Sequence, residues 1–146
     1  MVCFKKDLGV NFKFPSFEGN LLPLKSILEA TPSPKFTISD KLWAGHIKRT
    51  QRNLDRGTGF TAHTANLDKP SNTLVARYGK DGKECLAPQS DANPRLLTPR
   101  ECARLQGYPE KFLIPEVRTP AYKQFGNSVA VPVVTRIAKS ITEAMK

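Results

Sequence analysis

Long apolar runs are absent from this sequence. No stretch of about 18 apolar residues occurs, which is the length that a membrane-spanning helix needs. The first residues also lack the basic-then-apolar order of a signal peptide. These absences predict a soluble protein of the cytoplasm.

Metal-binding and disulfide-forming residues are scarce. The three cysteines, Cys3, Cys85 and Cys102, are odd in number and widely spaced, and the histidines are His46 and His63. This spacing fits neither a disulfide framework nor a zinc-binding motif. The sequence therefore predicts no metal site.

Acidic residues are few relative to basic ones. The 146 residues, a length typical of one domain, include 13 Asp and Glu against 23 Lys and Arg, for a net charge of +10. This excess favours a polyanionic partner, first of all nucleic acid, although anionic membranes and acidic proteins stay open. Residues 41–80 hold eight of the basic and two of the acidic residues. The alternative for this stretch is a solvated helix face.

The N-terminal part is predicted to be irregular, since the chain contains 12 prolines and 39% apolar residues. Residues 2–4 are apolar and precede a polar turn, which predicts a short strand. Because that strand starts abruptly, we expect a missing N-terminal portion. Residues 11–35 are predicted to form a linker with one short helix near residues 23–29.

A longer helix is predicted after Ser39, which is a favourable N-cap, and it should run to about residue 55. Trp43, Ile47 and Leu54 fall on one stripe at helical spacing and are expected to face the core. The other faces of this helix are basic.

The middle of the chain has strand and turn signals. We expect a glycine-rich loop over residues 57–61, a strand over 73–78, a tight turn over 79–82 and a second strand over 84–86. The loop is not a convincing nucleotide-binding motif, because no strand precedes it and no helix clearly follows.

Two helices are predicted in the last third of the chain. Thr98-Pro99-Arg100-Glu101 has the pattern of a capping box with proline at the first helical position, so a helix should start at residue 99 and end before Gly107. The final helix is predicted from about residue 129 to residue 144, because apolar residues recur every four positions on a wide face.

Two of these segments resemble motifs of one family. Residues 95–109, RLLTPRECARLQGYP, resemble the ninth motif of DNA (cytosine-5) methyltransferases, and residues 121–131, AYKQFGNSVAV, resemble the tenth. Residues 71–78 are similar to the Thr-Leu strand of that family's target-recognition domain. The chain thus resembles the C-terminal part of such an enzyme, either the smaller subunit of a split enzyme or a truncated copy.

The resemblance implies an α+β fold with four parts. Residues 1–14 would be the last strand region of the catalytic domain, 15–35 a linker, and 36–117 a small mixed target-recognition domain with short strands and loops that includes the ninth motif. Residues 118–146 would carry the tenth motif and a C-terminal helix belonging to the α/β, Rossmann-like domain that binds S-adenosylmethionine.

Several hallmarks of the family are absent from the sequence. In the family, a cysteine that follows a proline attacks C6 of a flipped cytosine, which makes C5 nucleophilic toward the methyl group. Here the cysteines follow Val2, Glu84 and Glu101. The Phe-x-Gly-x-Gly and Glu-Asn-Val sequences and the arginine-rich eighth motif are also missing. We therefore predict no catalytic residue in this chain, which should be inactive when isolated.

The tenth motif supplies the expected cofactor site. The resemblance implies that Gly126, Asn127, Ser128 and Val129 face S-adenosylmethionine, which would be shared with a catalytic partner chain. We expect these residues at the start of the last helix, where unpaired backbone N–H groups favour a polar or anionic ligand. The alternative is that Asn127 or Ser128 only caps that helix.

Double-stranded DNA is the other expected partner. Arginine suits bidentate contacts to guanine and lysine suits phosphate, so we predict DNA contacts from the loops and the strand of the recognition domain. The predicted DNA-binding residues are Arg56, Thr58, Phe60, His63, Thr73, Arg77, Tyr78, Lys80 and Lys83. A structural role is expected for the ninth-motif residues Thr98, Arg100, Glu101 and Arg104.

Three functions remain open from the sequence. The first is a recognition subunit of a prokaryotic restriction-modification methyltransferase that docks onto a separate N-terminal chain bearing the nucleophile. The second is an inactive truncated remnant, and the third is a DNA-binding module without chemistry. The apolar face of the last helix predicts that the isolated chain is marginally stable or aggregates.

Overall fold

The computed structural model describes residues 1–146 except 58 and 60. Over these residues the chain forms short 3-10 helices, α-helices and connecting loops. The 3-10 helices are η1 (Lys6–Leu8), η2 (Leu24–Ile27) and η3 (Pro34–Phe36). The α-helices are α1 (Asp40–Asp55), α2 (Tyr78–Asp81), α3 (Pro99–Leu105), α4 (Arg118–Asn127) and α5 (Val131–Ala144).

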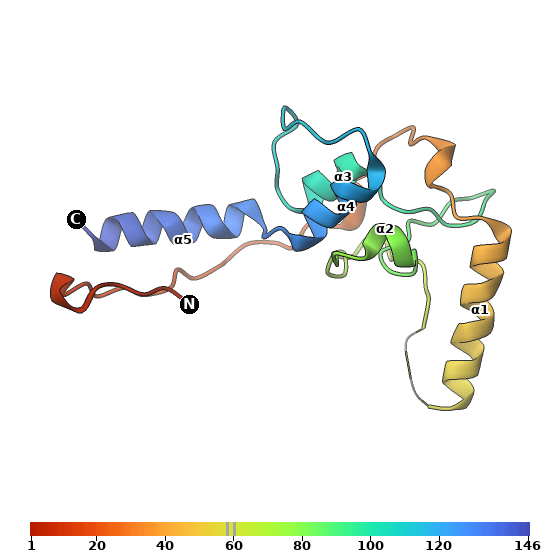
Figure 1. The fold of residues 1–146 in the computed structure, drawn as a ribbon, viewed down its shortest axis with the longest axis horizontal. Helices are drawn as coiled ribbons and strands as arrows, with labels where there is room; N and C mark the ends of the chain where they lie inside the picture. The colour runs from red at the N-terminus through yellow and green to blue at the C-terminus, as the bar shows by residue number, and fades with distance from the viewer. Residues whose placement is uncertain (58, 60) are drawn as a thin grey trace.

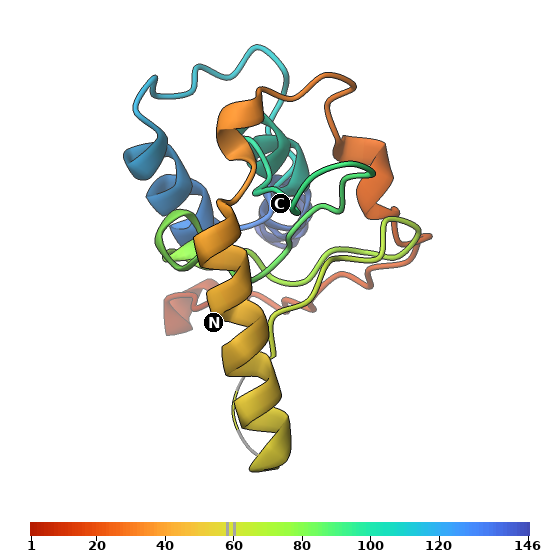
Figure 2. The same cartoon turned by 90° about the vertical axis from the view of Figure 1, so that its right-hand side faces the viewer.

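A central body is built from α2, α3, α4 and η2 (Figures 1 and 2). Helix α4 packs against both α2 and α3, and η2 packs against α3. Their apolar side chains form one core with the loops that precede α1 and α3. The core residues are Leu24, Phe36, Ile38, Leu74, Tyr78, Cys85, Leu86, Ala87, Leu96, Leu97, Cys102, Ala103, Ala121, Tyr122 and Phe125.

The capping box predicted at the start of α3 is confirmed. The Thr98 hydroxyl accepts a hydrogen bond from the Glu101 N–H at 3.1 Å, and the Glu101 carboxylate accepts one from the Thr98 N–H at 2.7 Å. Two free backbone donors of the helix start are thereby satisfied. The helix ends at Leu105, and Gly107 follows with φ +76°, a conformation that favours glycine.

Helix α1 forms where it was predicted, with the Ser39 side chain accepting from the N–H of Leu42. The prediction that Trp43, Ile47 and Leu54 form a buried stripe is wrong for Ile47 and Leu54. Ile47 is 53% exposed and Leu54 59% exposed, while His46 is the buried residue of the helix. The reason is geometric, because contact with the core is made by Trp43 and His46 in the first two turns of α1, and the rest of the helix extends past the core (Figure 1).

The strand predictions fail over the described residues. Residues 2–4 and 73–77 form no strand, and residues 78–81 form α2 instead. Gly82 has the positive φ of 53° that ends this helical turn, and local bonds such as Tyr78 N–H to Val75 O (2.9 Å) replace a ladder. In place of regular strands there are isolated bridges, which pair Thr37 with Arg95, Thr64 with Leu86 and Ala87 with Arg95. The expected α+β class is thus met only in part, since the described chain is mostly helical.

The C-terminal third contains one helix more than predicted. Helix α4 occupies residues that were expected to be a loop, and it buries Ala121, Tyr122 and Phe125. Helix α5 begins at Val131 rather than residue 129 and has proline in its first turn. The short helix expected near residues 23–29 is the 3-10 helix η2.

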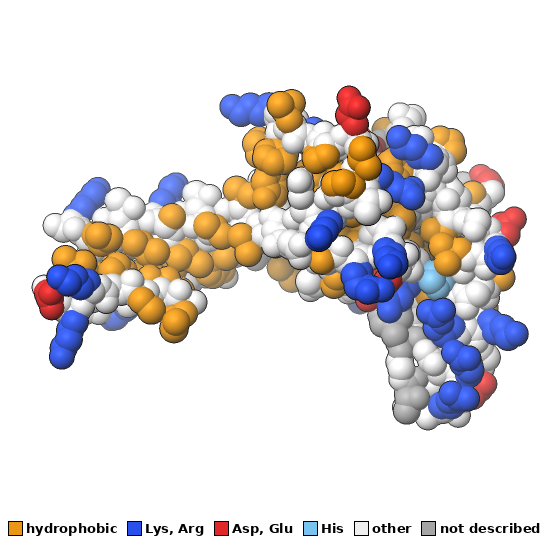
Figure 3. Space-filling view, viewed as in Figure 1, with side chains coloured by type: hydrophobic (Ala, Val, Ile, Leu, Met, Phe, Trp, Pro, Cys, Tyr) orange, Lys and Arg blue, Asp and Glu red, His pale blue; other side chains and the backbone are white. Residues whose placement is uncertain are grey.

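Two helices project from the body in different directions. Helix α5 extends to one side with the N-terminal segment running beside it, and α1 extends at the other end (Figures 1 and 2). A cation–π contact of 5.6 Å joins Arg136 of α5 to Phe17 of the N-terminal segment. Hydrophobic side chains gather along α5, whereas Lys and Arg gather around α1 and α2 (Figure 3). Within the described ranges, no helix has the length and apolarity to cross a membrane.

Candidate functional site

The ninth and tenth motifs meet in the structure. The Tyr122 hydroxyl donates to the Leu97 carbonyl at 2.6 Å, and the Gln106 side chain donates to the Phe125 carbonyl at 3.1 Å. The N–H of Val131 donates to the Gln106 carbonyl at 2.8 Å. These bonds hold the turn between α4 and α5 against the end of α3.

Glycine is required where these elements touch. A Cβ at Gly107 would lie 2.5 Å from Cδ of Pro132, and one at Gly126 would lie 2.3 Å from the Val75 carbonyl oxygen. The second contact is with backbone, which cannot rotate away. Gly126 therefore allows α4 to approach the segment that leads into α2.

A buried ion pair organises the loop before α3. The Arg95 guanidinium donates to both carboxylate oxygens of Glu101, at 2.7 and 2.8 Å, and the two side chains are 5% and 0% exposed. The same carboxylate accepts from the N–H of Glu29 at 2.7 Å. Glu101 thus joins the capping box, the bridge residue Arg95 and the segment after η2.

The remaining ninth-motif residues also make structural contacts. The Thr98 hydroxyl donates to the Glu29 carboxylate at 2.6 Å, and Arg100 donates to the Phe112 carbonyl at 2.9 Å. Arg104 pairs with Glu110 at 2.7 Å and donates to the Ile27 carbonyl at 3.2 Å. Each of the four predicted structural residues therefore fixes a loop to α3.

The predicted cofactor residues lie at a different place from the expected helix start. Gly126 and Asn127 end α4, Ser128 is its C-cap, and α5 starts only at Val131. The expectation of free N–H groups at a helix start is therefore wrong for this corner, and so is the N-cap alternative. The corner is instead a hollow of about 560 Å³, lined by Tyr108, Lys123, Gln124, Asn127, Ser128 and Val129.

Polar groups in this hollow differ in how firmly they are held. The Ser128 hydroxyl is hydrogen-bonded to the Tyr108 hydroxyl at 2.7 Å, so both are fixed. Asn127 is exposed, and its amide has no partner within the part of the chain that the structure describes. An asparagine amide offers donors and an acceptor to a polar ligand.

The prediction that Tyr78 contacts DNA is wrong. Its side chain is 1% exposed, and its hydroxyl donates to the Cys85 carbonyl at 3.1 Å while accepting from the Leu97 N–H at 2.7 Å. Burial raises its pKa well above the usual range, and its ring packs edge-on against Tyr122. Tyr78 is a core residue because α2 turns it inward.

The other candidates around α2 stay at the surface. Arg77 is exposed and pairs with Asp81 at 3.2 Å, a bond that raises the pKa of Arg77 and lowers that of Asp81. Lys80 is exposed and Lys83 is half-buried. Lys80 belongs to α2, and Lys83 directly follows its C-cap Gly82. Lys and Arg side chains gather around α1 and α2 in Figure 3.

The remaining DNA candidates lie farther along the loop that follows α1. Arg56 is the exposed C-cap of α1, and His63 and Thr73 are exposed. The His63 ring lies 3.2 Å from the Thr61 carbonyl oxygen. Thr58 and Phe60 lie outside the described residues.

The two thiols in the core are unsuited to nucleophilic attack. Cys102 is 0% and Cys85 2% exposed, and burial raises the pKa of each, that of Cys102 strongly. A thiolate rather than a thiol is the attacking species, so such residues are inert. The described residues also contain no cluster of side chains that could hold a metal ion.

Solved structures with a similar fold are methyltransferases. Schizosaccharomyces pombe Dnmt2 matches with a TM-score of 0.66 and 18% identity, over 88% of this chain and 44% of that chain. A Spodoptera frugiperda DNMT2 mutant matches with a TM-score of 0.67 and 16% identity, over 89% of this chain and 45% of that one. The chain therefore has the fold of part of a Dnmt2-type methyltransferase.

Sequence relatives are bacterial DNA methyltransferases. Type II methyltransferase M1.ScrFI of Lactococcus lactis subsp. cremoris is 48% identical over 137 residues, which are 93% of this chain and 35% of that protein. Type II methyltransferase M.NlaX of Neisseria lactamica is 47% identical over 93% of this chain and 44% of its own length. The chain thus spans less than half the length of these relatives.

Residues 1–143 match the family of C-5 cytosine-specific DNA methylases. The chain belongs to that family. The predicted resemblance to cytosine-5 methyltransferases is thereby confirmed at the level of the family.

Four residues of the site were missed by sequence reasoning. Arg95 is the partner of Glu101, and the hollow beside Asn127 is also lined by Tyr108, Lys123 and Gln124. Arginine six residues before a capping-box glutamate is no recognised signal. Tyr108 and Lys123 lay within the motifs, but only the three-dimensional contact of the motifs brings them together.

Proposed function

We propose that this chain is the DNA-recognition and cofactor-completing portion of a DNA (cytosine-5) methyltransferase. The observation that supports this most directly is the contact between the ninth and tenth motifs, which builds the Asn127 hollow from described residues that include no cysteine. Methyl transfer to C5 of cytosine would then require a second stretch of polypeptide that carries the Pro-Cys, Phe-x-Gly-x-Gly and Glu-Asn-Val sequences. The chain would be inactive alone.

The Asn127 hollow suits one side of S-adenosylmethionine. The cofactor supplies the electrophilic methyl group, and this chain would supply polar contacts to its charged and hydrogen-bonding parts. Asn127 is free to donate and accept, and the Tyr108–Ser128 pair presents fixed hydroxyls next to it. Lys123 would balance a carboxylate in the same hollow. The roles of Gly126 and Val129 would be to shape this corner.

The domain boundaries follow from this proposal. Residues 36–117 would form the target-recognition domain, with residues 15–35 as the linker that leads into it. Residues 1–14 and 118–146 would both return to the catalytic domain, which agrees with the N-terminal segment lying beside α5 (Figure 1). The exposed apolar face of α5 would pack there.

Complementation tests the proposal. This chain is mixed with the part of M1.ScrFI that it does not match, duplex DNA and radiolabelled S-adenosylmethionine. Incorporation only when both polypeptides are present supports a recognition subunit. Incorporation by this chain alone would contradict the claim that the chain lacks the nucleophile. No incorporation, in parallel with an active whole M1.ScrFI control, would favour an inactive remnant, or a DNA-binding module if duplex is still bound.

A matched pair of variants tests the cofactor corner in the complemented enzyme. Asn127→Ala should weaken binding of S-adenosylmethionine while duplex affinity stays nearly unchanged, because the hollow lies away from the basic surface around α1. Asn20→Ala, which removes an exposed amide in the linker, should change neither. Equal loss of cofactor and DNA affinity in Asn127→Ala would show that Asn127 is structural.

A further inference from the structure

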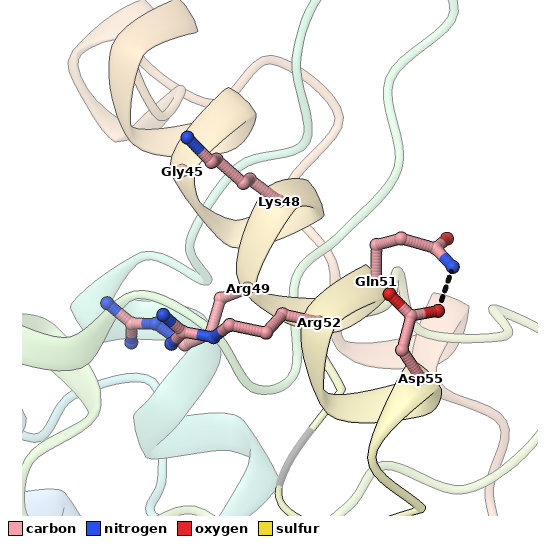
Figure 4. A pocket seen from close by; sticks show the side chains of 6 residues that line it. All are labelled: Gly45, Lys48, Arg49, Gln51, Arg52 and Asp55. Atoms are coloured by element: carbon pink, nitrogen blue, oxygen red, sulfur yellow. Dashed lines mark hydrogen bonds between the residues drawn. The ribbon is translucent and has the colours of Figure 1, made fainter.

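The basic residues of α1 form one continuous stripe. Lys41, Lys48, Arg49, Arg52 and Arg56 are all exposed and, at 100° per residue, fall within an arc of roughly 100° around the helix. Figure 4 shows Lys48, Arg49 and Arg52 extending to one side of the helix, while Gln51 and Asp55 lie on the other. We call these five residues the α1 stripe.

No acidic group forms an ion pair with the α1 stripe within the described part of the chain. The two carboxylates of the helix are held by amides, with Asn93 donating to Asp40 at 2.6 Å and Gln51 donating to Asp55 at 2.8 Å. The ion pairs in the described residues all lie elsewhere. The stripe is therefore available to an external anion.

The spacing within the stripe is unfavourable for an isolated helix. Arg52 is four residues from both Lys48 and Arg56 and three from Arg49, and like charges at these spacings repel each other. A bound polyanion would remove that repulsion. The arrangement is thus better suited to a partner than to a solvated surface.

The described residues outside α1 leave the stripe uncovered. The loop after α1 folds back onto another face of the helix, where the Thr50 hydroxyl accepts from the Ala62 N–H at 2.8 Å. Trp43 and His46, which contact the body, also lie away from the stripe. The direction in which α1 projects therefore presents the stripe to solvent.

Gly45 opens a gap in the middle of the stripe. A Cβ built there meets nothing within 4 Å, and Gly45 lines two adjoining hollows of about 650 and 320 Å³. Arg49 lines both hollows as well. Asp55 also lines the larger hollow, but its carboxylate accepts from Gln51 at 2.8 Å on the side away from Arg49 and Arg52 (Figure 4). A phosphate group could therefore approach the helix backbone beside Gly45 between cationic side chains.

We propose that the α1 stripe is the main phosphate-contacting surface of this chain and lies along one strand of duplex DNA. The 16 residues of α1 span about 24 Å, over which one strand of B-DNA presents about seven phosphates. The stripe would position the duplex independently of sequence, while base reading belongs to the loops. This inference rests on the proposed function for its choice of DNA as the polyanion.

Duplex binding by residues 1–146 at several salt concentrations tests the proposal. The triple variant Lys48→Gln/Arg49→Gln/Arg52→Gln should reduce the slope of log affinity against log salt by about 2.7, since each phosphate contact contributes about 0.9. At about 0.1 M salt this corresponds to a loss on the order of a hundredfold or more. The control Lys111→Gln/Lys139→Gln/Lys146→Gln removes the same charge from exposed positions outside the stripe and should change affinity by less than about threefold.

Two results would overturn the proposal. Equal losses in both triple variants would mean that only net charge matters, and an unchanged slope in the stripe variant would mean that the stripe touches no phosphate. Polyglutamate serves as a competitor of similar charge density. If it binds as tightly as the duplex, with the same dependence on the stripe, the surface would fit an acidic protein and not DNA.

Gly45→Leu gives a second test, in which a loss of duplex affinity cannot be explained by loss of folding. Leucine favours helix more than glycine, so thermal stability should rise, yet the side chain fills the gap and duplex affinity should fall several-fold. Unchanged affinity with raised stability would count against phosphate approach at Gly45. These binding measurements need no methyl transfer, so failure of the stripe and failure of the proposed enzyme function are distinguishable.

Discussion

Helices α1 and α5 leave the same body, but their free faces have opposite chemistry. Helix α1 exposes the cationic α1 stripe, whereas α5 exposes Val133 and Val134 and buries none of its residues within this chain (Figure 3). A cationic face can stay solvated until a polyanion arrives, whereas exposed apolar side chains on one helix face favour burial against another surface. Under the proposed function, the α1 arm would meet DNA and the α5 arm would meet the rest of the enzyme.

The body between the arms makes the comparison testable. The two arms are helices α1 and α5. If they act independently, a change in α1 should alter DNA binding only and a change in α5 should alter docking only, while a change in the body should alter both. The core around Glu101 and the α4 contact at Gly126 connect the two arms.

The largest expected effect is at Glu101. Glu101→Leu leaves Arg95 buried without its partner, which should destabilise the fold by about 3–5 kcal/mol in denaturant unfolding and abolish both DNA binding and complementation. The double variant Arg95→Met/Glu101→Leu should recover part of this loss. Lys25→Gln, which breaks an exposed pair with Asp68, should change stability little. Equal effects of the buried and exposed changes would contradict this account of the core.

Two glycines in helices give a matched pair of opposite sign. Gly126→Ala places a methyl group against the Val75 backbone and should cost roughly 1–3 kcal/mol of stability. Gly45→Ala, in open space on α1, should instead stabilise the helix by up to about 1 kcal/mol. Thermal or urea unfolding of both variants measures the difference. A neutral Gly126→Ala would show that α4 does not need its close approach.

The apolar face of α5 can be disrupted without changing DNA binding. Val134→Asp places a charge on the exposed face of α5, so the isolated chain should keep its stability and aggregate less. Docking to the complementing polypeptide should lose about 2 kcal/mol, a roughly thirtyfold weaker complex, because the charge would be buried unpaired. Methyl transfer titrated with the complementing polypeptide gives that shift, and duplex affinity should stay the same. Lys139→Gln on the same helix is the control, and equal loss there would argue against an apolar interface.

The smallest predicted effect concerns pH and the cationic arm. Burial lowers the pKa of His46 below its ordinary value, opposed by a hydrogen bond with the Gly82 backbone and reinforced by the charges of Arg49 and Lys83. Because the unfolded state protonates first, stability should be full above about pH 6.5 and should decline as pH falls below it. His46→Gln should flatten this decline between pH 7.5 and 5.5 in urea unfolding, and His63→Gln should not. A decline unaffected by His46→Gln would assign it to other groups.

Local signals in the sequence predicted part of the fold. The Ser39 cap and the capping box at Thr98 each depend on residues within one turn, and both helices start where expected. The strand at 73–78 failed because a strand requires a partner that local pattern does not reveal. Helix α4 was missed because Pro120 indicated a loop, whereas it stands in the first turn of the helix and Ala121, Tyr122 and Phe125 share one face.

The site was less predictable than the helices. Motif likeness directed attention to Asn127 and Ser128, but the assumed helix start was wrong, since α4 ends there and α5 begins later. Tyr78 looked like a surface aromatic until α2 turned it into the core. Contacts such as Tyr108–Ser128 depend on tertiary packing of distant segments, which composition and spacing do not encode.

The most direct test of the central claim is to find which polypeptide becomes bonded to DNA. A duplex with 5-fluorocytosine at the target position should trap the covalent intermediate, because fluorine cannot leave as the proton does. With this chain, the complementing part of M1.ScrFI and S-adenosylmethionine, the adduct should form on the complementing polypeptide and depend on the presence of this chain. An adduct on Cys3, Cys85 or Cys102 of this chain would contradict the account.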